Sequence, residues 1–210
     1  MSLPPDYLRD PDEIYRRSFE IVRAETDLAR LPGSLHGMAI RIVHACGMPD
    51  VVDDLDWSGD PAAAGRAALA AGRPVLTDVQ MVADGVIRER LPAGNGVYCF
   101  VGEPGMAARA RRAGTTRSAA AVERWLPVLD GAVVAIGNAP TALFRLLEVL
   151  DEGAPAPAVI LAFPVGFVGA AESKRALADF AGGPPWLTLH GRRGGSAMAA
   201  AAVNALAGGV

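Results

Sequence analysis

A histidine near the end of an apolar segment is the first residue in this sequence that could carry out acid–base chemistry. The segment RIVHACG (residues 41–47) places His44 beside apolar residues and shortly before a glycine. Apolar spacing predicts a helix over residues 35–45, with Gly47 at its end and Pro49 beyond it. The negative end of a helix dipole stabilises an imidazolium, so this position would raise the pKa of His44 toward the working range of a general acid. The alternative is a structural role among apolar side chains.

The other histidines and the cysteines give no sign of a metal site or of a covalent nucleophile. His36 and His44 share the expected helix but are too far apart for an i, i+4 ligand pair, and no carboxylate stands at ligand spacing from either. His190 is the third histidine. Cys46 and Cys99 are too few for a disulfide framework or a zinc ribbon, which indicates a reducing compartment. Because Cys46 has no obvious His–Asn partner set and no GxSxG motif is present, hydrolase chemistry is not supported.

A segment rich in glycine and arginine, GRRGGSAM (residues 191–198), could bind an anion. It follows an expected strand and opens the expected last helix, so backbone N–H groups, the helix dipole, Arg192 and Arg193 could converge on one negative group. Gly194 and Gly195 belong to the same loop. The segment lacks the GK[ST] ending of a P-loop and the GxGxxG spacing of a dinucleotide site. The alternative is that its glycines only let the last helix pack close to its strand.

Arg117 and Ser18 are two further polar residues in positions that require a partner. Thr115 or Thr116 is a natural N-cap, so Arg117 lies in the first turn of a helix, where the dipole disfavours a cation. An anionic ligand would explain that placement, and a solvated arginine is the alternative. Ser18 lies on the apolar face of its helix, where its hydroxyl could meet a ligand or bond back to its own helix.

The elements that must position these residues alternate between strands and helices. Residues 12–27 repeat apolar side chains at helical spacing and predict an N-terminal helix. After Arg73 the expected strands are PVLTDV, VYCFV, AVVAIG, AVILAF and WLTLH, and the expected helices begin at Val79 and span residues 106–129, 141–150, 170–180 and 196–206. This pattern predicts an α/β fold in one domain over residues 1–210, a doubly wound and mostly parallel sheet with helices on both faces. Ligands of such sheets bind outside the carboxyl ends of the strands.

Length, charge and composition exclude several classes of partner. The 210 residues are 51% hydrophobic, which is ample for one domain with a core. A formal net charge of -3 and a pI near 5.6 give no global attraction for nucleic acid or for an anionic membrane. The polar, proline-broken N-terminus and the lack of a run of about 20 apolar residues indicate a soluble, cytoplasmic protein. Lys174 is the only lysine, and the many arginines suit bidentate recognition of carboxylates or phosphates.

Six motifs together give the sequence a family resemblance. It resembles the precorrin-8X methylmutase family over nearly its whole length, with motifs in the family's order: HACGMPD (44–50), TDVQMV (77–82), GTTRSAAAVE (114–123), GNAPTALFRLLE (137–148), FPVGFVGAAESK (163–174) and GRRGGSAMAAAAVNALA (191–207). The resemblance implies a flavodoxin-like domain, a homodimer with active sites near the subunit interface, and an isomerase of cobalamin biosynthesis. The implied reaction is a one-five sigmatropic shift of a methyl group on ring C of precorrin-8X, giving hydrogenobyrinate, with no cofactor and no metal.

The resemblance also implies roles for particular residues. The family's essential histidine matches His44, and its substrate-contacting serine and arginine match Ser18 and Arg117. Motifs around the ring system match Asn138 in GNAPTA and residues 192–195 in GRRGGSAM. Arginines and helix N-termini would bind the carboxylates of the macrocycle, and His44 would protonate or hydrogen-bond a ring nitrogen.

Several alternatives to this function stay open at the level of sequence. Cobalt-precorrin-8 could replace precorrin-8X as the substrate, with cobyrinate as the product. A non-catalytic carrier could bind a corrinoid with the same arginines and pass it on, and the enzyme itself could hand its product to the next enzyme of the pathway. A nucleotide-binding α/β domain would require a glycine fingerprint that the sequence lacks.

Overall fold

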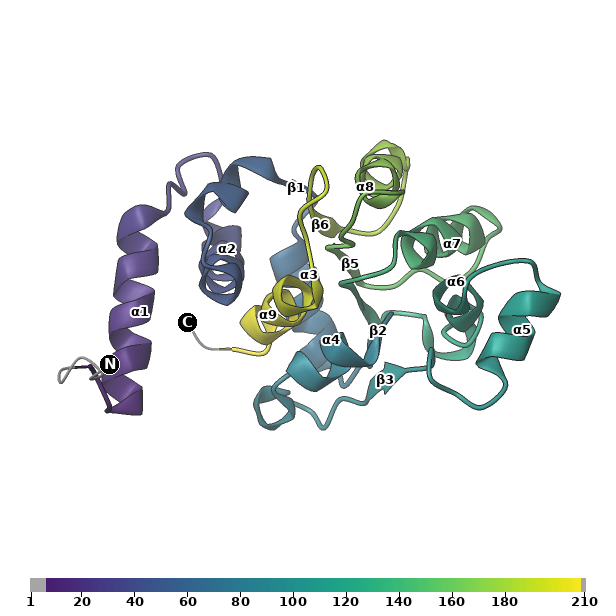
Figure 1. Cartoon of the computed structure of the whole chain (residues 1–210), viewed down its shortest axis with the longest axis horizontal. Coiled ribbons are helices and arrows are strands. Elements are labelled where there is room, and N and C mark those ends of the chain that lie inside the picture. Colours follow the sequence, from purple (N-terminus) through teal and green to yellow (C-terminus); the bar gives the residue numbers. More distant parts are fainter. Residues whose placement is uncertain (1–6, 209–210) are drawn as a thin grey trace, which may run out of the picture.

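A six-stranded sheet crosses the middle of the molecule in the computed structural model, which describes residues 7–208 (Figure 1). The strands lie in the order β1-β6-β5-β4-β2-β3, and every pairing is parallel except that of β1 with β6. Their bounds are Leu55–Ser58 (β1), Val75–Thr77 (β2), Val97–Cys99 (β3), Val133–Ile136 (β4), Val159–Ala162 (β5) and Trp186–Leu189 (β6). The parallel strands β2 to β6 fall within the apolar runs of the sequence, which confirms the mostly parallel sheet.

The order of the parallel strands is flavodoxin-like. Counted along the chain from β2, these strands stand in space as 2-1-3-4-5. The topological switch point of this arrangement lies between β2 and β4, because the chain extends the sheet first on one side of β2 and then on the other. The predicted fold class is therefore confirmed, with β1 added as an antiparallel edge strand.

Helices cover both faces of this sheet. In β4, Val133 and Ala135 pack with α2, α3, α4 and α9, whereas Val134 and Ile136 pack with α6, α7 and α8. Figure 1 shows the first group to the left of the sheet and the second group, with α5, to its right. The bounds are Pro11–Glu25 (α1), Gly33–Cys46 (α2), Pro61–Ala70 (α3), Gln80–Gly85 (α4), Met106–Arg112 (α5), Arg117–Val122 (α6), Pro140–Asp151 (α7), Ala170–Asp179 (α8) and Ser196–Leu206 (α9), with short 3-10 helices Pro49–Asp54 (η1), Arg88–Arg90 (η2) and Leu126–Val128 (η3).

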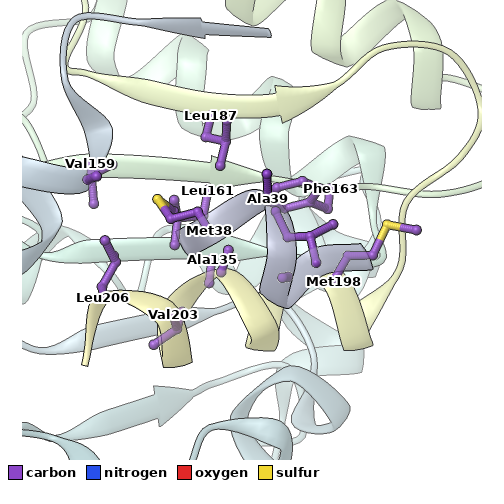
Figure 2. Packing of buried hydrophobic residues seen from close by; sticks show 14 of the residues in the cluster. Met38, Ala39, Ala135, Val159, Leu161, Phe163, Leu187, Met198, Val203 and Leu206 are labelled. Atoms are coloured by element: carbon purple, nitrogen blue, oxygen red, sulfur yellow. The ribbon is translucent and has the colours of Figure 1, made fainter. Parts of the chain in front are cut away.

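The larger core lies between the sheet and helices α2 and α9. Figure 2 shows Met38 of α2 together with Met198, Val203 and Leu206 of α9 close to strand residues such as Leu161. Helix α9 is alanine-rich and buried along most of its length, which lets α2 pack closely beside it. No helix among residues 7–208, α9 included, meets the length and hydropathy of a membrane span. The packing on α9 holds α2, the helix that carries His44, against the sheet.

Helix α2 ends where the sequence predicts. Gly47 adopts φ 69°, in the left-handed region, and its N–H donates to the carbonyl of Val43 at 2.7 Å. A residue with a Cβ would be strained in this conformation. The turn leads into η1, and His44 lies in the last turn of α2 as expected.

Helix α1 packs on α2 and stands away from the sheet (Figure 1). Its N-terminus is capped by the Asp10 carboxylate, which accepts the N–H of Glu13 at 2.9 Å. Phe19 is only 2% exposed, whereas Ile14 is 45% and Ile21 is 47% exposed. Helix α1 therefore leaves an apolar surface that the described part of the chain does not cover.

Three segments differ from the expectation based on sequence. The single helix over residues 106–129 is wrong, because the chain breaks at Gly114, which has φ 61°, and a new helix starts after the Thr116 cap. The antiparallel strand β1 was missed, because its residues LDWS include an aspartate and a serine and do not form a continuous apolar run. Helix α3 was also missed, although the Asp60 cap and Pro61 at its first position are typical start signals.

Candidate functional site

His44 is held in place by contacts with α1. The Oγ of Ser18 lies 3.0 Å from Nδ1 of His44, and the ring of Phe19 stacks on the imidazole with centroids 4.4 Å apart and planes at 20°. The hydroxyl of Ser18 therefore meets a side chain of another helix, a partner that neither of the two alternatives from the sequence included. Because this contact takes Nδ1, Nε2 is the ring nitrogen left for a ligand.

The electrostatic surroundings of His44 differ from the prediction. Partial burial lowers the pKa of His44 below its usual value, and the guanidinium of Arg41, one turn earlier on α2, lowers it further. The Arg41 side chain is itself buried and donates to the hydroxyl of Tyr15 at 2.9 Å. The prediction of a raised pKa for His44 is wrong, because partial burial and the neighbouring cation lower it. Both effects favour the neutral form of the imidazole in the free protein.

Two cavities flank His44. One, of about 210 Å³, lies between α1 and α2 and is lined by His44 together with Ser18 and Pro49. The other, of about 270 Å³, lies between α2 and α9 and is lined by His44 together with Gly85 and Ala197. Both are smaller than the roughly 300–1,000 Å³ of typical ligand pockets, so a large ligand would have to extend beyond either of them.

A third cavity lies at the carboxyl ends of β5 and β6. It has a volume of about 270 Å³ and is lined on one side by Met48 and on the other by Phe167 and Arg192. Gly47 and Pro49, the neighbours of Met48, line the cavity that contains His44. The turn after α2 therefore separates two adjoining cavities.

The side chain of Arg193 joins η1 to the loop between β6 and α9. Its Nη1 donates to Asp50 at 2.6 Å and its Nη2 donates to Asp54 at 2.5 Å. Both arms of the guanidinium are thus engaged within the chain, whereas the sequence suggested that Arg193 could face an anion. The neighbouring Arg192 is exposed, lies 5.4 Å from the ring centroid of Phe167, and makes no ion pair with residues 7–208.

The glycines of the loop between β6 and α9 allow close packing of the backbone. A Cβ at Gly194 would overlap the carbonyl oxygens of Phe163 and Pro164. The N–H of Gly195 donates to the carbonyl of Phe163 at 2.8 Å. These contacts favour the packing alternative for Gly194 and Gly195 over an anion cradle.

Lys174 is fully buried beneath the same loop. Its Nζ donates to the carbonyl oxygen of Arg193 at 2.6 Å, and the residue is 0% exposed. Burial lowers the pKa of Lys174 to about 8, while the carboxylate of Asp54 acts in the opposite direction. The loop between β6 and α9 is therefore held from below by α8.

The switch point between β2 and β4 is filled by a carboxylate of the chain itself. Asp78 follows β2, is 1% exposed, and accepts the backbone N–H groups of Gly137 at 2.9 Å, Asn138 at 3.0 Å and Ala139 at 2.7 Å. Burial raises the pKa of Asp78, and the three donors oppose that rise. The backbone groups that could bind an anion before α7 are thus taken, and the exposed Asn138 is held at the edge of the sheet.

Arg117 lies in the other helix layer. Thr116 caps α6 as predicted, and its Oγ1 also lies 2.8 Å from Oγ1 of Thr141 in the first turn of α7. Arg117 is exposed and makes no ion pair within the described residues. The structure therefore places Arg117 near the loop of Asn138, across the sheet from His44.

The other two histidines have partners within the chain. Nε2 of His36 lies 3.1 Å from the carbonyl of Leu31, and Nε2 of His190 lies 2.8 Å from Oδ2 of Asp56. Across residues 7–208, no three His, Cys, Asp or Glu side chains are placed to share a metal ion.

Three residues that hold the site or its loops in place were not predicted from the sequence. Asp78 had a usable signal, because a carboxylate directly after an apolar strand stands at the carboxyl edge of the sheet. Lys174 stood out as the only lysine, but its burial is a tertiary property. Phe19 had no local signal, because its stacking partner lies on another helix.

Comparison with known proteins gives one consistent match. Residues 13–208 match the family model described as precorrin-8X methylmutase. The precorrin-8X methylmutase of Pseudomonas aeruginosa is 61% identical, over 96% of this chain and 97% of the relative. A cobalt-precorrin-8 methylmutase of Priestia megaterium is 33% identical, over 93% of this chain and 87% of the relative. A crystal structure of precorrin-8X methyl mutase from Thermus thermophilus superposes with a TM-score of 0.85 at 37% identity, covering 93% of this chain and 94% of that chain.

The buried lysine predicts a dependence of stability on pH. The folded-state pKa of Lys174 is about 8 and the unfolded value is 10.5, so the unfolded chain binds more protons in this interval and stability rises as the pH rises through it. As the pH rises, the unfolding free energy of wild type should therefore increase relative to that of Lys174→Met, by up to about 1.4 kcal/mol per pH unit. Urea denaturation at several pH values from about 8 to 10 measures it. Arg175→Met, on the same helix, should show no such slope, and an equally flat profile for Lys174→Met would contradict the assignment.

Proposed function

The chain belongs to the precorrin-8X methylmutase family, and on this premise we propose that it is an isomerase of cobalamin biosynthesis that converts precorrin-8X to hydrogenobyrinate. The reaction is a one-five sigmatropic shift of a methyl group on ring C, so the substrate gains and loses no atoms overall. The observation that carries the assignment of the site is the contact between Ser18 and His44, with a cavity on each side of the imidazole.

The substrate is the metal-free precorrin. The chain is 61% identical to a precorrin-8X methylmutase and 33% identical to a cobalt-precorrin-8 methylmutase, and this difference supports precorrin-8X over the cobalt-containing precursor.

His44 acts as the proton donor in this proposal. Ser18 engages Nδ1 and Phe19 fixes the plane of the ring, so Nε2 is presented to the substrate in a defined direction. The pKa of His44 is lowered in the free protein, and the carboxylates of a bound substrate would raise it again by bringing negative charge close. The imidazolium then donates to a ring nitrogen, stabilises the charge that develops as the methyl group moves, and recovers its proton afterwards.

Exposed arginines bind the peripheral carboxylates of the macrocycle. Arg192 stands beside the cavity that adjoins the turn after α2, and Arg117 and Asn138 stand at the carboxyl edge of β4. Because Arg117 lies across the sheet from His44, it would contact the periphery of the substrate and not the reacting ring. Arg193, paired with Asp50 and Asp54, holds the loop in place.

The protein works as a cytoplasmic homodimer that can hand hydrogenobyrinate to the next enzyme of the pathway. Two observations support the first part: Cys46 and Cys99 are both free thiols, and α1 exposes apolar side chains next to the helix that carries His44. A second copy could cover Ile14 and Ile21, which the described chain leaves 45% and 47% exposed.

Loss of His44 should slow the methyl shift and spare binding. His44→Ala and His44→Asn should bind hydrogenobyrinate with near-normal affinity, while the rate of the methyl shift falls by about 10²–10⁴-fold, as expected for losing a positioned proton donor. Ser18→Ala should lower the rate by only about 3- to 10-fold, since one neutral hydrogen bond contributes about 0.5–1.5 kcal/mol. Single-turnover spectra and equilibrium titrations measure both quantities. His36→Gln on the same helix serves as the control, and a fully active His44→Ala would overturn the role of His44.

Removal of Arg117 should weaken binding of the substrate. A hydrogen bond to a charged group contributes about 1.5–3 kcal/mol, so Arg117→Ala should weaken hydrogenobyrinate binding by that amount. Arg117→Lys should recover only part of it, because the fork geometry of the guanidinium is lost. Arg66→Ala, an exposed arginine on α3, is the control in the same titration. Equal affinity for all four proteins would show that Arg117 is only solvated.

The proposed dimer should be visible in solution. Sedimentation equilibrium at micromolar concentration should give about twice the chain mass of 21.7 kDa. Ile14→Ser with Ile21→Ser should shift the equilibrium toward the monomer, because both side chains would leave a buried interface. A wild-type protein that sediments as a monomer would refute the dimer.

A further inference from the structure

An apolar loop tip stands at the carboxyl edge of the sheet without cover from residues 7–208. Phe167 and Val168, between β5 and α8, are 84% and 88% exposed. They lie between Gly166, with φ 135°, and Gly169, with φ 81°, both in the left-handed half of backbone space. The backbone thus turns sharply on both sides of two apolar side chains and holds them in solvent.

A cation and a cavity adjoin this tip. The guanidinium of Arg192 lies 5.4 Å from the ring centroid of Phe167, and both residues line the cavity of about 270 Å³ that Met48 closes on the other side. Arg192 makes no ion pair within the described chain. An apolar surface with one positive charge at its edge complements a flat conjugated ring that carries carboxylates on its periphery.

The tip is also continuous with the environment of His44. The N–H of Gly166 donates to the carbonyl of Arg192 at 3.2 Å, so the two loops are joined into one unit. The ion pairs of Arg193 hold this unit against η1, directly after the turn of α2. A ligand lying over Met48 would reach both the cavity beside Phe167 and the cavity beside His44.

We propose, in an inference that rests on the proposed function, that Phe167 and Val168 form an apolar cover over one face of the bound macrocycle, while Arg192 binds a carboxylate at the edge of the macrocycle. Each cavity alone is too small for a tetrapyrrole-derived ring, and a ring lying across the turn after α2 would occupy both the cavity beside His44 and the cavity beside Phe167. One face of the ring then meets the tip of the loop. Closing that face removes water from around the conjugated system and strengthens the hydrogen bond from His44.

The double variant Phe167→Ser with Val168→Ser tests the cover. Because both side chains are exposed, the variant should fold like wild type, which thermal melting would verify. Its affinity for hydrogenobyrinate should fall about 10- to 100-fold, the scale of losing the burial of one or two apolar side chains, and KM for precorrin-8X should rise more than kcat falls. Val128→Ser is the matched control, because Val128 is 38% exposed in η3, shortly before β4 begins.

The outcomes separate this inference from the proposed function and from a dimer contact. If wild type does not convert precorrin-8X at all, the proposed function fails. If wild type converts it but the double variant binds hydrogenobyrinate as tightly as wild type, only the cover is refuted. If the double variant sediments as a smaller species than wild type, the tip belongs to a subunit contact and the cover is likewise refuted. Weaker binding with unchanged sedimentation and an unaffected Val128→Ser control would support the cover.

Discussion

The turn after α2, where the cavity beside His44 adjoins the cavity beside Phe167, is fixed to the carboxyl edge of the sheet by one arginine. Arg193 makes this connection through ion pairs with Asp50 and Asp54. The ammonium group of Lys174 also donates a hydrogen bond to the backbone carbonyl of Arg193. The side chains of Arg193 and Asp50 are 37% and 66% exposed, so each ion pair contributes little to stability in solvent. The two ion pairs instead fix geometry: because both carboxylates bind one planar guanidinium, they determine how η1 lies relative to the loop between β6 and α9. Gly194 reinforces it by packing directly on the backbone after β5.

The candidate site does not lie at the usual ligand position of a flavodoxin-like sheet. In such folds ligands commonly bind at the switch point, where backbone N–H groups before a helix meet an anion. Here Asp78 supplies the anion from within the chain and orders the loop that carries Asn138. The cavities lie instead between α1, α2 and α9 and at the ends of β5 and β6. The chain thus shares a widespread fold, but its proposed chemistry depends on an added N-terminal helix pair.

The sequence predicts those features that depend on local pattern. Five strands, the end of α2 at Gly47 and the Thr116 cap follow from apolar runs, a C-terminal glycine and an N-cap residue. Features that depend on contacts between distant segments were missed or wrong. Burial lowers the pKa of His44, and this burial depends on the packing of α1 against α2. Arg41, three residues earlier on the same helix, lowers this pKa further and could have been considered from the sequence alone. The engagement of Arg193 by η1 joins segments far apart in the sequence, and the burial of Lys174 shows only once α8 and the last loop are packed.

We assign the pair formed by Ser18 and His44 to an isomerase and not to a passive corrinoid carrier. The most direct measurement is the visible spectrum of precorrin-8X during incubation with the purified protein. An isomerase will convert the spectrum to that of hydrogenobyrinate, because the methyl shift completes the conjugation at ring C. A pigment that binds to the protein and keeps the spectrum of precorrin-8X would contradict the claim.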